Sequence, residues 1–111
     1  LLCRELGGHH GDEANVVAGD FIIRQIKGPD GFLPPDFREY ATYYAAQGMF
    51  QLGGRYWEEF GAAMYRHLLP RQSPEGFWAS SGGTDYGPVY ATSMYVLALT
   101  VSYQQLPIYQ R

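Results

Sequence analysis

Three short strings of this sequence recur in the same order, and this internal repeat limits the fold more than any other feature. The pairs are Leu6–Gly8 with Leu52–Gly54, Pro29–Phe32 with Pro74–Phe77, and Tyr40–Thr42 with Tyr90–Thr92. Their shifts are 46, 45 and 50 residues. A period of this size is typical of helix-pair units that stack into solenoids and related arrays. The whole chain, residues 1–111, is therefore predicted to be one segment of about two and a half units.

Two segments between the repeat marks carry apolar residues on one helical face, because these residues recur at three- and four-residue spacing. In the segment from Asp12 to Lys27 the stripe consists of Ala14, Val17, Ala18, Phe21 and Ile22. In the segment from Arg55 to Leu69 it consists of Trp57, Phe60, Gly61, Met64 and Leu68. We expect two equivalent amphipathic helices that bury these stripes.

The segment 36–52 is apolar nearly all round and almost free of charge, which predicts a helix covered on several sides. Asp36 is a candidate N-cap, and Glu39, three residues further on, completes the pattern of a capping box. Gly53 is the expected C-terminal stop.

The counterpart of this helix is expected from Val89 onward, with Pro88 in its first turn and Pro107 as its end. The window 89–106 is the most apolar of the chain, but Thr, Ser and Gln side chains interrupt it. A lipid-facing helix would avoid such interruptions, so a buried helix is predicted rather than a membrane span. The fold class that follows is all-α, built from repeated antiparallel helix hairpins.

Composition excludes some classes of partner and leaves the compartment open. The formal net charge is −3 and the eight Lys and Arg residues are scattered, so nucleic acid is an unexpected partner. Cys3 is the one cysteine, which allows no internal disulfide and leaves the cellular localisation undetermined. The opening Leu1-Leu2-Cys3-Arg4 lacks both an initiator Met and a signal sequence, so we expect a piece of a longer chain.

The loop that contains Gln72, Gly76 and Trp78 matches the Gln-x3-Gly-x-Trp "QW" motif of squalene and oxidosqualene cyclases. With the repeat marks, it gives nearly the whole chain a resemblance to the terpenoid cyclase and protein prenyltransferase superfamily. This resemblance implies a partial α/α toroid, in which inner and outer helices alternate and QW loops join them. Gln72 and Trp78 are expected to staple the fold. The earlier loop, 25–33, is a degenerate copy with Leu33 in place of the Trp.

The segment carries none of the catalytic signatures that the resemblance would lead one to seek. The Asp-x-Asp-Asp acid motif of squalene-hopene-type cyclases is absent from the sequence. Prenyltransferases bind zinc through a Tyr-His-Thr string, but Ala91 replaces the His in Tyr90–Thr92. Asp85, in a Gly-rich loop, is the one acid that we expect to reach a cavity, although a local turn bond is the commoner role. Catalysis by this segment alone is not expected, and whether the parent is an enzyme stays open.

Histidine and cysteine residues give no trusted metal site. Cys3, His9, His10 and Asp12 have a spacing that fits no closed tetrahedral zinc site, so we interpret them as a polar turn between helices. His67 falls in the last turn of its helix, where a partly charged imidazole suits the helix dipole. We predict neither a metal nor a cofactor.

Two hypotheses for function follow. In the first, the segment is a non-catalytic part of a toroid that helps to line an apolar cavity for an isoprenoid-type ligand, and Tyr43, Tyr44, Tyr90 and Tyr95 are the lining candidates. Core packing is the commoner role of such tyrosines. In the second, the repeats form a scaffold that binds a protein partner. Either way, the isolated segment is expected to self-associate, because repeat stacks need about three units and capped ends.

Overall fold

The computed structural model describes residues 1–81 and 86–103, and every regular element in them is a helix. Its elements are the helices α1 (Leu2–Leu6), α2 (Glu13–Ile26), α3 (Arg38–Leu52), α4 (Gly54–Leu68) and α5 (Gly87–Leu99), with the short 3-10 helices η1 (Leu69–Arg71) and η2 (Val101–Tyr103). The prediction of an all-α fold is confirmed for these residues.

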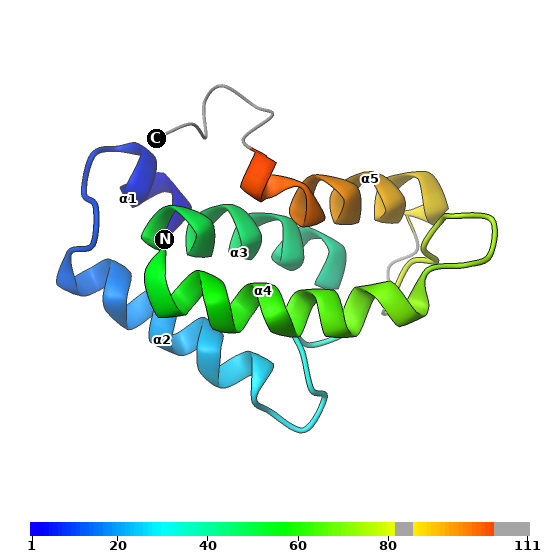
Figure 1. The fold of residues 1–111 in the computed structure, drawn as a ribbon, viewed down its shortest axis with the longest axis horizontal. Helices are drawn as coiled ribbons and strands as arrows, with labels where there is room; N and C mark the ends of the chain where they lie inside the picture. The colour runs from blue at the N-terminus through cyan, green and yellow to red at the C-terminus, as the bar shows by residue number, and fades with distance from the viewer. Residues whose placement is uncertain (82–85, 104–111) are drawn as a thin grey trace.

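The helices form two layers that alternate along the chain. α3 lies between α1 and α5 and packs on both, and α2 packs on α4 in the second layer (Figure 1). α3 also packs on α4 and α2, so it is the central helix of the molecule. This position explains the sequence of α3, because a helix with neighbours on several sides needs apolar or small residues all round.

Corresponding repeat marks lie at corresponding places in this arrangement. Leu6 ends α1 and Leu52 ends α3, each directly before a Gly-Gly pair. Gly53 has φ 74° and terminates α3 as predicted, since a residue without Cβ enters this region at little cost. Gly31 and Gly76, one in each Pro-acid-Gly-Phe loop, have φ 68° and 96°.

The start of α3 differs from the predicted capping box. Phe37 is the N-cap, in the left-handed region with φ 55°, and no side chain caps the helix. Asp36 therefore lies outside the first turn. The carboxylate of Glu39 is buried and accepts hydrogen bonds from the backbone N–H and the hydroxyl of Ser81 instead. The Glu39 carboxylate, which the local pattern assigned to the helix cap, is thus bound by Ser81, a residue distant in sequence.

α5 begins as expected and ends early. Pro88 lies in its first turn, where a missing N–H costs nothing. The helix ends at Leu99, and the hydroxyl of Thr100 donates a 2.7 Å hydrogen bond to the carbonyl of Val96. Pro107, the predicted end, lies outside the described residues. Within the described part of the chain, no helix is long and apolar enough to cross a membrane.

The predicted face of α2 is only partly right: Ala18 and Ile22 are half-buried, and Ile22 packs on the core. The exposed residues of α2 include Ala14, Val17 and Phe21. The buried ones are Asn15, Gly19, Ile23 and Ile26. The reason is close packing at Gly19, where a Cβ would lie 2.7 Å from Leu52 and 2.8 Å from the ring of Tyr56. This contact turns the glycine side of α2 toward α3 and α4 and leaves Val17 and Phe21 in solvent.

The predicted face of α4 is confirmed, except that Trp57 is only half-buried. Phe60, Met64 and Leu68 are completely covered. They join residues from every layer in one hydrophobic core, whose largest covered side chains also include Phe32 and Met49.

Candidate functional site

The loop with the QW-type motif fastens two helices through its tryptophan. The indole Nε1–H of Trp78 donates a 2.9 Å hydrogen bond to the carbonyl of Leu68, at the C-terminal end of α4. The backbone N–H of Trp78 donates to the hydroxyl of Thr92 on α5 at 3.0 Å. Gln72 stays within the loop, because its amide donates to the carbonyl of Gly76 at 2.9 Å. Of the two residues expected to staple the fold, only Trp78 therefore binds a helix-end carbonyl, that of Leu68.

The degenerate first loop uses a different residue for burial. Leu33, the counterpart of Trp78, is buried, and so is Phe32. The counterpart of Phe32 is Phe77, which is 41% exposed. The two loops share their turn glycine and the buried position of Leu33 and Trp78. One aromatic ring is buried in each loop, that of Phe32 in the first and that of Trp78 in the second.

Tyr95, one of the four lining candidates, belongs to the core. It is 3% exposed and its ring packs edge-on against Trp78 at a centroid distance of 5.9 Å. Burial raises its pKa to about 12. This residue presents no ring to any open surface of the described chain.

The other three candidates belong to a cluster of tyrosines on α3 and at the start of α5, which we call the aromatic face. Its members are Tyr40, Tyr43, Tyr44, Tyr86 and Tyr90. Ring centroids lie 4.7 Å apart for Tyr40 and Tyr44, 4.9 Å for Tyr43 and Tyr44, and 5.1 Å for Tyr86 and Tyr90. The neighbouring phenol of Tyr40 raises the pKa of Tyr44, and partial burial raises the pKa of Tyr90.

A hollow of about 540 Å³ opens in the aromatic face, and we call it the aromatic hollow. Its lining residues are Phe37, Tyr40, Tyr86 and Tyr90, from α5 and the start of α3. Phe37, Tyr40 and Tyr86 are each more than half exposed, so large aromatic surface stands in solvent here. Sequence reasoning missed these three residues. The position of Tyr40 in a repeat mark, directly equivalent to Tyr90, was the signal that could have found it.

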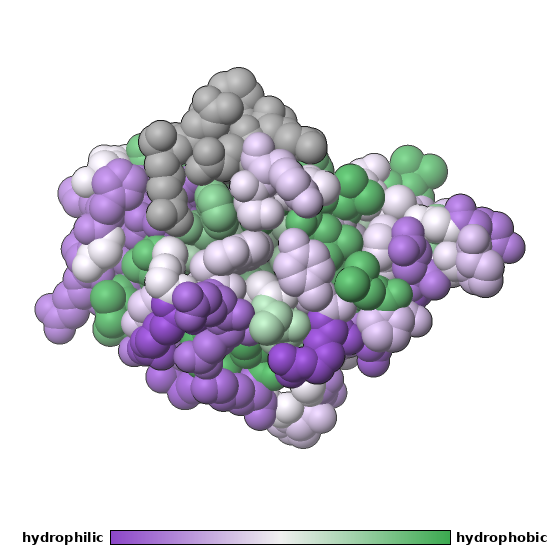
Figure 2. Space-filling model, in the orientation of Figure 1, coloured by the Kyte–Doolittle hydropathy of each residue, from purple (hydrophilic) through white to green (hydrophobic). Residues whose placement is uncertain are grey.

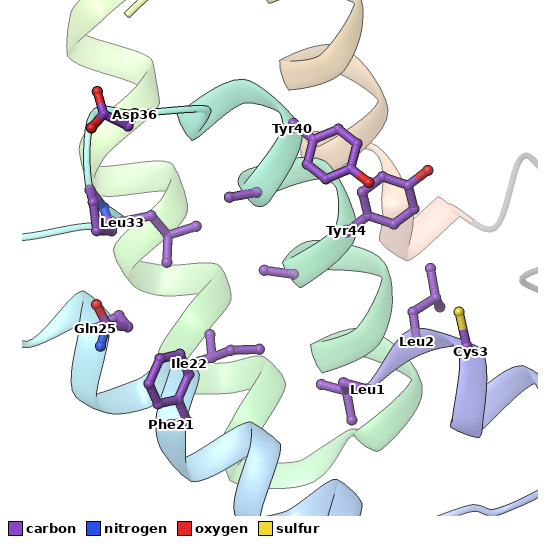
Figure 3. A pocket seen from close by; sticks show the side chains of 13 residues that line it. Leu1, Leu2, Cys3, Phe21, Ile22, Gln25, Leu33, Asp36, Tyr40 and Tyr44 are labelled. Atoms are coloured by element: carbon purple, nitrogen blue, oxygen red, sulfur yellow. The ribbon is translucent and has the colours of Figure 1, made fainter. Parts of the chain in front are cut away.

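A second concavity, of about 590 Å³, lies between α1, α2 and α3, and we call it the helix groove (Figure 3). Tyr40, Ala41, Tyr44 and Ala45 line it from α3. Side chains of α1, α2 and the loop after α2 line the rest, among them those of Leu1, Ile22 and Leu33. Tyr40 therefore borders both concavities.

Asp85, the acid that we expected to reach a cavity, lies outside the described residues. Among the described residues, no acid lines the aromatic hollow, and Asp36 lines the helix groove.

The polar residues near the N-terminus form a hydrogen-bonded cluster between α1 and α2. Arg4 pairs with Asp12 and holds its pKa below the usual value. The carboxylate of Glu5 is fully covered and accepts from the amide of Asn15 at 2.6 Å, with His10 Nδ1 2.9 Å away. Among the described residues, no group of three or more His, Cys, Asp or Glu side chains is placed to hold a metal ion.

His67 is a neutral core residue, and the prediction of a partly charged imidazole is wrong. Its ring stacks on Phe32 at a centroid distance of 4.7 Å and is 8% exposed. Burial, together with the positive charges of Arg71 and Arg38, lowers its pKa to about 4. A protonated ring would lose more by burial than the helix dipole returns.

Comparison with protein-family models, curated proteins and solved structures gives no match to this chain. Functional inference therefore starts from the aromatic face itself.

Proposed function

We propose that the chain is a non-catalytic segment of an α/α toroid similar to the terpenoid cyclases and prenyltransferases, and that its aromatic face lines an apolar cavity for an isoprenoid-type ligand. The observation that carries this proposal is the set of exposed tyrosine rings on α3 and at the start of α5. Tyr40, Tyr44 and Tyr86 are 52%, 42% and 58% exposed. Clustered exposed aromatic surface of this kind usually marks a contact or ligand site.

The position of these rings agrees with the proposal. They lie on α3 and at the start of α5, two helices of one layer that pack on each other. In the proposed toroid this layer would be the inner ring. Their faces offer apolar area and a negative electrostatic surface, which suits a polyene or a carbocation. Any acid that initiates a reaction would have to come from another part of the parent, because the acid motif is absent from this sequence.

Equilibrium binding of squalene and of prenyl diphosphates to the chain, in detergent below its micelle concentration, tests the proposal. Saturable binding is expected, and Tyr40→Ala with Tyr90→Ala should weaken it by about tenfold or more, because two stacking rings are lost. Tyr103→Ala is the matched control, since that ring is 74% exposed but lies at the other end of α5. Absence of saturable binding to both the chain and its full-length parent removes the proposal.

A protein-binding scaffold is the second candidate, and a separate surface favours it. Val89 and Val96 on α5 are 80% and 44% exposed, and Figure 2 shows apolar residues (green) reaching the surface over this helix. Such a ridge suits a helical partner. Sequence flanking the segment separates the candidates: an Asp-x-Asp-Asp motif or a zinc triad there favours the enzyme, and further repeats with neither favour the scaffold.

A further inference from the structure

We propose that the aromatic hollow binds a small quaternary ammonium ion, such as choline, against its four aromatic side chains. This inference goes beyond the isoprenoid proposal, because a small cation needs only the hollow and neither a toroid nor a longer apolar cavity. Three properties of the hollow support it: the lining is aromatic, the neighbouring charge is negative, and the rings are accessible.

Two helices bring the aromatic lining together. Phe37 and Tyr40 come from the start of α3, and Tyr86 and Tyr90 come from the start of α5. α3 and α5 pack on each other and run in the same direction, so their first turns lie at the same end of the molecule (Figure 1). The planes of the Tyr86 and Tyr90 rings meet at 61°, so these rings do not stack face to face. Four aromatic rings thus border one concavity.

Phe37 holds its ring at the hollow in a strained backbone conformation. Its φ of 55° lies in the left-handed region, which a bulky side chain rarely enters. The side chain is 58% exposed, so burial of the ring does not offset the strain. Strained residues of this kind cluster at ligand sites. Contact with a ligand is therefore a physical reason for an exposed ring at this position.

A quaternary ammonium ion matches this lining chemically. The face of an aromatic ring carries partial negative charge, and it attracts a cation placed above it. A quaternary nitrogen has no N–H to donate, so it needs no oxygen ligand from the protein. The hollow offers only the tyrosine hydroxyls as polar side-chain groups. A primary ammonium, which is strongly hydrated, would lose water here without gaining equivalent partners.

A buried carboxylate makes the neighbourhood of the hollow negative. Glu39 is 3% exposed, and it accepts hydrogen bonds from the backbone N–H and the hydroxyl of Ser81, which are neutral donors. Within residues 1–81 and 86–103, Glu39 belongs to no ion pair. Burial, followed by the charge of Glu39, raises the pKa of Tyr90. The field of this carboxylate therefore reaches one wall of the hollow.

The same distribution of charge disfavours an anion. Of the described residues that line the hollow, none is Lys, Arg or His. Arg38, next to Glu39 in the sequence, donates to the carbonyl of Leu33 at 2.7 Å instead. A phosphate group in the hollow would lose its hydration without gaining a charge-assisted hydrogen bond. We therefore expect the free ammonium ion to bind better than the same ion carrying a phosphate.

Choline and its neutral isostere, the alcohol in which carbon replaces the ammonium nitrogen, test the proposal. The two ligands have the same shape and differ in charge alone. We expect choline to bind at least about fivefold more tightly, since each exposed ring contributes about two- to fivefold to the attraction of a cation. Titrations followed by nuclear magnetic resonance measure both affinities. The methyl protons of bound choline should also move upfield, because they lie over ring faces.

Variants of the hollow separate the attraction of the rings from apolar contact. Tyr86→Leu keeps apolar volume without an aromatic face, and Tyr86→Phe keeps the face, at a position that is 58% exposed. The Leu variant should bind choline about two- to fivefold more weakly than the Phe variant, and the isostere should not distinguish them. Glu39→Gln removes the charge and keeps the shape, so it should also weaken choline binding selectively. Tyr103→Leu, at a ring that is 74% exposed and does not line the hollow, is the control.

Several results would overturn the proposal. These are equal affinities for choline and the isostere, absence of saturable choline binding, and equal effects of Tyr86→Leu and Tyr103→Leu on choline binding. Tighter binding of phosphocholine than of choline would identify a phosphate site and would also overturn it. The measurements use no isoprenoid. A hollow that accepts only hydrocarbon would bind squalene without preferring choline to the isostere, so failure of this proposal is distinguishable from failure of the isoprenoid proposal.

Discussion

Replacement of Trp78 by Phe should cost the fold far more than removal of Gln72, the other signature residue of the same loop. The indole of Trp78 is 4% exposed, and its N–H satisfies the carbonyl of Leu68 at 2.9 Å in a buried place. Phenylalanine keeps an aromatic ring against Tyr95 but leaves that carbonyl without a donor. An unsatisfied buried acceptor costs about 1–3 kcal/mol, and the lost ring volume adds to this cost.

We therefore expect Trp78→Phe to lower the free energy of unfolding by about 2–4 kcal/mol. Gln72→Ala removes an exposed hydrogen bond within the loop, which water replaces, so its expected cost is below about 0.5 kcal/mol. Trp57→Phe, the same change at a half-buried position, should cost about 1 kcal/mol.

Urea denaturation followed by far-UV circular dichroism measures all three variants without relying on tryptophan emission. If Gln72→Ala destabilises the chain as much as Trp78→Phe, or if Trp78→Phe costs no more than Trp57→Phe, the assignment of the stapling role to the indole is refuted.

Three further predictions concern other parts of the chain. The pKa of His67 is about 4 in the folded chain and about 6.5 when unfolded, so the unfolded state binds the extra proton, and stability falls as the pH drops from 6.5 to 4. The loss is about 2 kcal/mol after allowance for partial solvation, and His67→Phe should flatten this part of the pH profile of the denaturation midpoint. Gly19→Ala should lower the free energy of unfolding by about 1–3 kcal/mol, because its Cβ would lie 2.8 Å from the ring of Tyr56. Gly61→Ala is the control: its Cβ would meet its nearest neighbour at 3.5 Å, so the change should be neutral or stabilising. Thermal denaturation of both variants measures the difference. The isolated chain should self-associate in light scattering, and Val96→Lys should reduce the apparent mass; a monomer at all concentrations would contradict this expectation.

The parts of the fold that the sequence predicted correctly are those decided by local chemistry. Gly53 ends α3 because its φ of 74° suits a residue without Cβ. Pro88 lies in the first turn of α5, where a backbone N–H would have no partner within the helix. Burial of Phe60 and Met64 on α4 also followed from spacing alone, since one side of this helix faces the core along its length.

Errors arose where a distant residue decides the outcome. The buried side of α2 is set by the close approach of Gly19 to Leu52 and Tyr56, which no pattern within α2 reveals. Glu39 was assigned to a helix cap but pairs with Ser81, which is 42 residues away. The site followed the same rule: spacing indicated tyrosines on α3 and α5, and only the packing shows that Tyr95 is core while Tyr40 is open.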